Sequence, residues 1–141
     1  MPANTALQIK GLQVPRYGID PPDISNCHDA DDAIEFFNRY SVQLDEWQEL
    51  VLRSWLSRRA DGKWAASKAG LSIARQQGKS LLLEVRCIFG MIFLKEKIIF
   101  TAHELRTARA VFNRICEFFE DDSHPEITKL VKVIRKANGL D

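Results

Sequence analysis

One segment of the sequence combines the residue types that bind phosphate. Residues 73–80 read Ile-Ala-Arg-Gln-Gln-Gly-Lys-Ser and end as a phosphate-binding loop ends. Gly78 lets backbone N–H groups approach phosphate oxygens, the Lys79 ammonium can reach the β- and γ-phosphates, and the Ser80 hydroxyl can ligate Mg²⁺. A helix that starts here adds its own partial positive charge. The segment therefore predicts a site for the phosphates of a nucleotide.

The loop departs from the general pattern G-x-x-x-x-G-K-[ST], because Ile73 stands where that pattern has its first glycine. Since Gly-Lys-Ser alone is a short motif, the alternative is a chance tripeptide at a helix start. The context favours phosphate binding: a short apolar run over 69–74 precedes the motif and a long apolar stretch over 79–94 follows it. This is the strand, loop and helix order that a phosphate loop requires.

Two glutamines upstream could recognise a base. Gln43 and Gln48 flank the start of a predicted helix, and Trp47 is next to the second. The glutamine amide offers both a hydrogen-bond donor and an acceptor, as an adenine edge requires. The alternative is that the glutamines are solvated residues at a helix start and that Trp47 belongs to the core.

The spacing of apolar residues predicts the elements that position these groups. Residues 1–28 hold four of the five prolines and predict an irregular N-terminal arm, followed by one domain over 29–141. An Asp61-Gly62 turn is predicted between helical regions. The predicted helices start near Asp29 and Asp45, cover 79–94 and 105–119, and start again at Pro125, with Gly139 as a C-terminal cap.

Two short apolar runs, over 69–74 and 97–101, predict strands. Strand, buried helix, strand, helix is the order of a parallel sheet that helices cover on both faces. The predicted fold class is therefore α/β: part of a P-loop NTPase, with a parallel sheet flanked by helices. We expect this fold to be incomplete in the chain, because a stable sheet normally needs three or more strands.

The net charge of the chain bears on whether it can bind DNA. Twenty Lys and Arg against nineteen Asp and Glu give a formal charge of +1, so any contact with DNA needs a local basic patch. The candidate patch, whose alternative is an ordinary solvated face, comprises Arg53, Arg58, Arg59, Lys63 and Lys68.

Nothing in the sequence predicts export or a membrane span. The first ten residues lack the apolar core of a secretory signal, and the stretch over 81–94 is too short to cross a bilayer. The three cysteines are far apart and outside any Cys-x-x-Cys spacing, which predicts reduced thiols. We therefore expect a cytoplasmic protein without membrane contact.

Three segments together resemble the N-terminal ATPase region of the tailed-phage terminase large subunit, the motor that packages double-stranded DNA into procapsids. They are residues 43–48, 74–80 and 100–108, and the resemblance covers roughly residues 40–141. That family uses a loop of the form Arg-Gln-x-Gly-Lys-Ser/Thr without the leading glycine, so Ile73 agrees with the family pattern.

The resemblance implies a role for each residue of the site. Gln43 and Gln48 would bind adenine, while Lys79 would bind phosphate as a catalytic lysine and Ser80 would hold Mg²⁺ as the metal ligand. Arg75 would stabilise the charge on the transferring γ-phosphoryl group; the alternative is a surface residue that only positions the loop. The other residues that would contact the nucleotide are Gln76, Gln77 and Gly78.

The resemblance also implies cofactors and partners. The cofactors would be ATP and Mg²⁺. The partners would be double-stranded DNA, the small terminase subunit and the portal, in the cytoplasm of a bacterial host cell, and oligomers would form only in the full-length protein.

Other parts of a DNA-packaging ATPase have no counterpart in the sequence. After Thr101 no apolar run ends in the Asp-Glu pair that would hold Mg²⁺ and orient water. We therefore expect the leading piece of a longer ATPase, truncated before the acidic motif and the nuclease domain, which binds nucleotide but hydrolyses it poorly. The alternatives are a segment of a helicase-like P-loop ATPase and a non-enzymatic prophage remnant or interaction domain.

Overall fold

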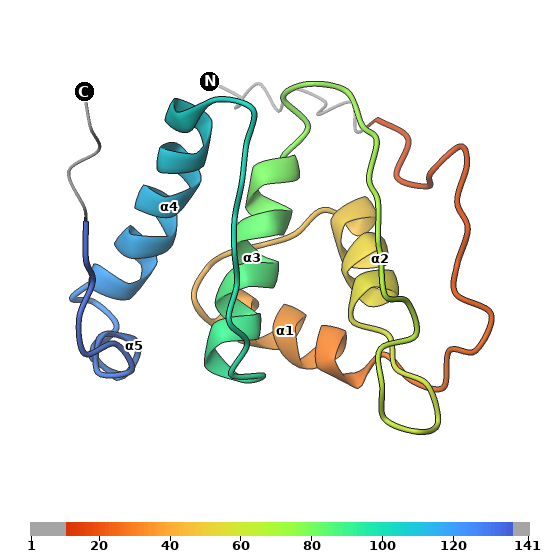
Figure 1. Cartoon of the computed structure of the whole chain (residues 1–141), viewed down its shortest axis with the longest axis horizontal. Helices are drawn as coiled ribbons and strands as arrows, with labels where there is room; N and C mark the ends of the chain where they lie inside the picture. The colour runs from red at the N-terminus through yellow and green to blue at the C-terminus, as the bar shows by residue number, and fades with distance from the viewer. Residues whose placement is uncertain (1–10, 137–141) are drawn as a thin grey trace, which may run out of the picture. The chain divides into compact units, whose positions relative to one another are not determined.

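The structure, a computed structural model, describes residues 11–136. In this range the chain forms five helices and no sheet (Figure 1). They are α1 (His28–Arg39), α2 (Glu46–Trp55), α3 (Lys79–Ile92), α4 (Leu105–Glu120) and α5 (Pro125–Thr128). The chain divides into two compact units: unit 1, Met1–Gln77, contains α1 and α2, and unit 2, Gly78–Asp141, contains α3 to α5.

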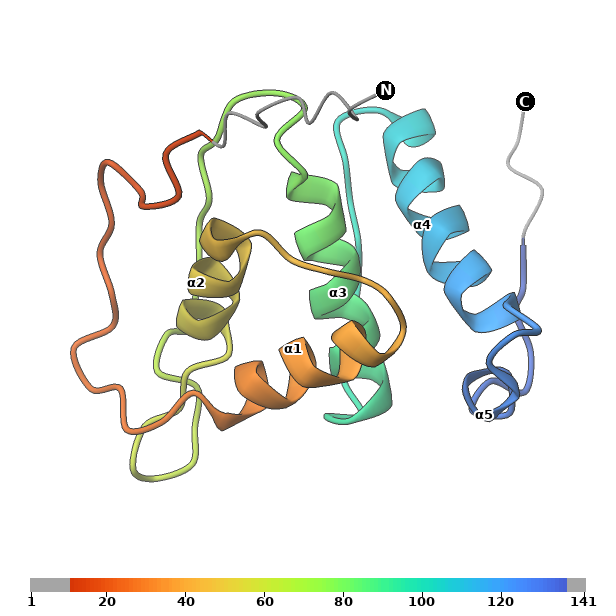
Figure 2. The same cartoon turned by 180° about the vertical axis from the view of Figure 1, so that it is seen from behind.

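In unit 1, α1 and α2 pack together through their apolar faces (Figure 2). Ala30 and Phe37 of α1 and Leu52 of α2 are buried. Acidic residues occupy the first turn of each helix, where they compensate the positive end of the helix dipole. The helices predicted from near Asp29 and Asp45 are therefore confirmed.

Arg58 connects the segments on either side of this helix pair. Its Nε donates a hydrogen bond to Asp29 Oδ2 at 2.6 Å, and its Nη1 donates one to the Gly62 carbonyl at 2.8 Å. The guanidinium lies 3.8 Å from the centroid of the Trp64 ring, and the Arg58 backbone forms isolated bridges to Asn26 and Trp64. Gly62 has a φ of 77°, so the turn predicted there is confirmed.

The buried helix predicted over 79–94 is confirmed as α3, the centre of unit 2. Its side chains Leu82 and Phe89 are buried, and α4 packs against it with Val111 buried. The carboxylate of Glu84, whose side chain is 10% exposed, accepts a hydrogen bond from Arg114 Nε at 2.6 Å. A buried carboxylate needs such a partner because it has lost its water.

The predicted parallel sheet, and with it the P-loop NTPase fold class, is wrong. Residues 69–74 and 97–101 run as irregular segments, and the bridges of Arg58 are the only β-type pairs within residues 11–136. A strand exists only where its backbone N–H and C=O groups bond to a neighbouring strand. Neither segment forms a backbone hydrogen bond within the described range. Their apolar, β-branched residues indicate an extended backbone but supply no pairing partner.

The two remaining predicted helices differ from the observed ones mainly in length. The helix predicted over 105–119 is confirmed as α4, whereas the one from Pro125 ends at Thr128. Several β-branched residues follow Pro125, and such residues disfavour helix. Residues 11–27 contain no helix. Gly139 and the first ten residues of the arm lie outside the described residues.

Gly90 permits a close approach within unit 2. The chain turns back after α3, and the Glu96 N–H donates to the Gly90 carbonyl at 3.0 Å. The Glu96 carboxylate then pairs with Arg86 Nη1 at 2.6 Å. A Cβ atom at position 90 would collide with Glu96 Oε2 and lie 2.6 Å from Arg86 Nη1.

We predict that Gly90→Ala lowers the free energy of unfolding by about 1–3 kcal/mol, the usual cost of overpacking, because it separates Glu96 from Arg86. Urea denaturation followed by circular dichroism measures the loss. Gly70→Ala is the control, since a Cβ there meets nothing within 4 Å. Equal losses in the two variants would contradict the close approach.

We also predict that Arg58→Lys lowers the stability of unit 1 by about 1–2 kcal/mol, because lysine keeps the charge but loses the planar fork and the stacking on Trp64. Arg59→Lys is the matched control and should change stability little, because Arg59 pairs with Asp61 at an exposed position. The midpoints of thermal unfolding compare the two variants. A larger loss in Arg59→Lys would refute the role of Arg58.

Candidate phosphate-binding loop

The segment over 74–80 makes a sharp turn into α3. Gln76 has a φ of 60° and Gly78 a φ of 79°, so both adopt the left-handed conformation. Gly78 is the N-cap of α3, and the helix begins at Lys79, as predicted, but the strand predicted before the loop, over 69–74, is absent. Left-handed residues in tight turns build the concave nests of N–H groups that bind anions.

The first turn of α3 has no negative partner of its own among the described residues. It contains no acidic residue and no side chain caps it. By contrast, α2 begins with a capping box formed by Asp45 and Gln48. Because the first N–H groups of a helix lack intrahelical acceptors and carry partial positive charge, the start of α3 is suited to an external anion.

The candidate residues of the loop face solvent. All six residues from Arg75 to Ser80 are exposed, and as consecutive residues they share one loop. Neither Arg75 nor Lys79 has an ion pair or side-chain hydrogen bond with any residue in the described range. The segment over 69–83 contains no Asp or Glu. Both cations are therefore free to approach a phosphate.

The two glutamines predicted to bind adenine differ in their surroundings. Gln48 is 2% exposed, and its Oε1 accepts a hydrogen bond from the Asp45 N–H at 2.7 Å. Gln43 is exposed in the segment between α1 and α2. Both belong to unit 1, whereas Lys79 and Ser80 belong to unit 2. The structure thus gives Gln48 a capping role, and adenine binding stays a prediction.

Ser80 is the candidate ligand for Mg²⁺ in the loop. Within residues 11–136, no group of three or more His, Cys, Asp or Glu could hold a metal ion. Mg²⁺ commonly binds to substrate phosphates and keeps several waters. Binding of Mg²⁺ by the Ser80 hydroxyl stays a prediction.

The three cysteines are free thiols, as predicted. Cys87 and Cys116 are buried and Cys27 is partly buried. Burial raises the pKa of the Cys87 thiol, which keeps it protonated and unreactive. The cysteines therefore have a structural role.

The basic cluster of unit 1 is largely paired with carboxylates. Arg53 pairs with Asp31 and Glu49, Arg58 with Asp29, and Arg59 and Lys63 with Asp61. The hydrogen bond from Arg59 lowers the pKa of Asp61, so this carboxylate is ionised at neutral pH. These pairs favour the interpretation as a solvated face, and contact with DNA stays a prediction.

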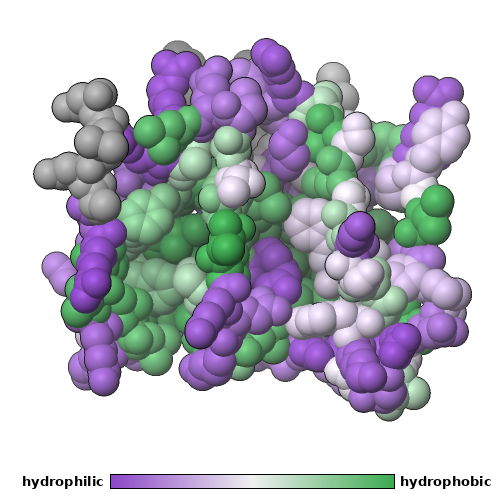
Figure 3. Space-filling model, in the orientation of Figure 1, coloured by the Kyte–Doolittle hydropathy of each residue, from purple (hydrophilic) through white to green (hydrophobic). Residues whose placement is uncertain are grey.

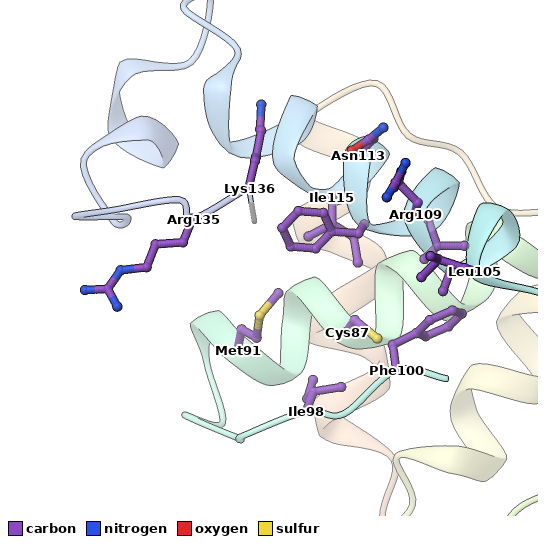
Figure 4. A pocket seen from close by; sticks show the side chains of 13 residues that line it. Cys87, Met91, Ile98, Phe100, Leu105, Arg109, Asn113, Ile115, Arg135 and Lys136 are labelled. Carbon is purple, nitrogen blue, oxygen red and sulfur yellow. The ribbon is translucent and has the colours of Figure 1, made fainter. Parts of the chain in front are cut away.

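Unit 2 contains a hydrophobic groove that the sequence does not predict. It has a volume of about 880 Å³ and is lined by α3, α4 and the segment after α3 (Figure 4). Its signal in the sequence is the apolar stripe of α4, in which Leu105, Phe112 and Ile115 recur at helical spacing. Leu105 is 66% exposed and Phe112 is 42% exposed, so α3 covers only part of the stripe.

Comparisons with protein-family models, curated proteins and solved structures find no match for this chain. In the part of the chain that the structure describes, no helix is both long and apolar enough to cross a membrane.

We predict that Gln48→Ala lowers the free energy of unfolding by about 1 kcal/mol, because it removes half of the capping box of α2. Gln43→Ala, which removes an exposed amide, should leave stability unchanged. Urea titrations of both variants provide the measurement. Unchanged stability in Gln48→Ala would show that the cap is dispensable.

Proposed function

We propose that residues 74–80 bind the phosphates of ATP together with Mg²⁺. We further propose that the chain is the nucleotide-binding segment of a DNA-packaging motor similar to the tailed-phage terminase large subunit. The observation that carries the proposal is the exposed loop with left-handed Gln76 and Gly78, which leads directly into α3 with Lys79 as the first helical residue. Anions bind at such helix starts because backbone donors and the helix dipole act together.

Each part of the loop would make a distinct contribution to binding. Backbone N–H groups would donate to phosphate oxygens around Gly78, where the absence of a Cβ allows close approach. The Lys79 ammonium would add a charge-assisted hydrogen bond, which is stronger than a neutral one. Arg75 is the second free cation and would lie beside the terminal phosphate.

The proposal includes weak hydrolysis. Mg²⁺, when bound with the nucleotide, neutralises phosphate charge and polarises the phosphoryl group. No carboxylate occurs over 69–83 to orient an attacking water, and Glu84 is paired with Arg114. The loop is therefore equipped to bind and orient phosphates more than to activate water.

The wider setting follows from the resemblance. The partners of such a motor would be double-stranded DNA, the small terminase subunit and the portal, and its place of action the cytoplasm of the bacterial host. No described residue is assigned to these contacts.

The first test is calorimetric titration of the folded chain with a non-hydrolysable ATP analogue and Mg²⁺. We expect saturable binding that Lys79→Ala weakens by about 10-fold or more, because a hydrogen bond to a charged group contributes roughly 1.5–3 kcal/mol. Lys97→Ala is the control: Lys97 is an exposed cation of unit 2 outside the loop. Equal weakening in both variants would indicate nonspecific electrostatic binding and contradict the proposal.

Base recognition is tested separately by comparing ATP, GTP and inorganic triphosphate. A preference for ATP that Gln43→Ala removes would support an adenine contact, and this variant spares the capping box. Absence of nucleotide binding by the folded chain would favour the non-enzymatic alternative. Unwinding of forked duplexes by the full-length protein would favour the helicase-like one.

A further inference from the structure

Unit 2 has a long hydrophobic groove apart from the phosphate-binding loop. Its walls are formed by Cys87 and Met91 of α3, by Ile98 and Phe100 of the segment that follows, and by the apolar face of α4 (Figure 4). A second hollow of about 310 Å³ adjoins it, since residues such as Met91 line both, and extends over Leu130, Val131 and Ile134. The two hollows form one groove, which we call the α3–α4 groove.

The α3–α4 groove has a large apolar surface open to solvent. Leu130 is 54% exposed and Val133 is 67% exposed, in addition to Leu105 and Phe112 of α4. Hydrophobic side chains gather in a hollow on the face shown in Figure 3, with hydrophilic ones around it. Isolated exposed apolar residues are common on proteins, but a continuous patch with a polar rim marks an interaction site.

The charged residues that line the groove all have one sign. They are Lys95, Arg109, Arg135 and Lys136, with no Asp or Glu among the lining residues. Lys136 is paired with Glu120 at 2.8 Å, whereas Arg109 and Arg135 have no ion pair within residues 11–136. Figure 4 shows these two arginines at opposite ends of the apolar side chains. An occupant that fits has an apolar middle and a negative charge at each end.

We propose that the α3–α4 groove binds an amphipathic helical segment of a partner protein, with apolar residues on one face and Asp or Glu near both ends. Binding of the apolar face of a helix in a hydrophobic groove is a recurrent mode of recognition. Arg109 and Arg135 would pair with the acidic ends, and fixed charges of this kind determine orientation and specificity.

Two other occupants fit the charges less well. A fatty acid carries one carboxylate and leaves one of the two arginines without a partner. A second copy of the chain, docked by the same face about a two-fold axis, would bring Arg109 and Arg135 toward the same residues of the other copy, and like charges oppose such docking. An acidic peptide satisfies both ends.

The test uses the full chain and a fluorescent peptide of roughly 14 residues, or four helical turns. The peptide has leucines at i, i+3, i+4 and i+7 and glutamates at both ends, and its matched control has lysines at both ends. We expect saturable binding of the glutamate peptide by fluorescence anisotropy, weaker at high salt. The lysine peptide should bind at least about 10-fold less tightly, since like charges at both ends oppose it.

Charge reversal makes the test specific. Arg109→Glu combined with Arg135→Glu should weaken binding of the glutamate peptide at least about 10-fold and create binding of the lysine peptide. Lys132→Glu is the control, because Lys132 is exposed but does not line the groove. Phe112→Ala should weaken binding of the glutamate peptide to the original groove and of the lysine peptide to the charge-reversed groove. Circular dichroism checks that each variant folds.

Three outcomes would overturn the proposal: equal affinity for the two peptides, no effect of the double charge reversal, or binding of phosphatidylglycerol vesicles in place of either peptide. The test is independent of nucleotide binding. Lys79→Ala should bind the glutamate peptide normally, so failure of the phosphate-binding loop and failure of the groove give different results.

Discussion

The buried carboxylate of Glu84 is the constraint on which unit 2 depends. It lies in the middle of α3, the most apolar helix of the chain, and its partner Arg114 belongs to α4. An ionised carboxylate without water is stable only when a charged donor reaches it. The hydrogen bond from Arg114 to Glu84 also raises the pKa of the Arg114 guanidinium. This interaction sets where α4 lies along α3, and with it the shape of the groove.

The two ends of α3 contribute to different candidate sites. Its middle is buried through residues such as Val85 and Ile88, whereas its first two residues, Lys79 and Ser80, are exposed. The start of the helix is a set of backbone donors beside Lys79. Its C-terminal half, through Met91, is one wall of the groove. A single apolar helix thus connects the proposed phosphate-binding loop with the proposed surface for an acidic partner, and both proposed ligands carry negative charge.

The residues at the start of α3 differ from those at the starts of α1 and α2. In α1 and α2 the chain supplies its own acidic residues at the N-terminus, and in α2 the Asp45–Gln48 capping box adds hydrogen bonds. In α3 the corresponding positions hold Gly78, Lys79 and Ser80. Partial positive charge at a helix start is stabilised by an anion from whatever source. The first turn of α3 contains no acidic residue, so its start is suited to an external anion.

The helices α1 to α4 and the turn before α3 can be predicted from the sequence, because their causes are local. Apolar residues at helical spacing placed α1 to α4, and Gly78 supplied the left-handed turn before Lys79. Acidic residues marked the starts of α1 and α2, since their interaction with the helix dipole requires no distant partner. The Asp61-Gly62 turn follows from the same local conformational preference.

The tertiary structure alone decided the features that need a distant partner. Residues 69–74 and 97–101 have the composition of strands, but a strand requires neighbouring backbone groups that no local pattern provides. Gln48 is buried as a cap, although its spacing from Gln43 suggested a base contact. The sequence predicts the apolar face of α4. How much of that face is exposed to solvent depends on the packing of α4 against α3. Whether an apolar side chain is buried depends on which residues pack opposite it. In this protein that packing decides which apolar residues belong to the core and which line the groove.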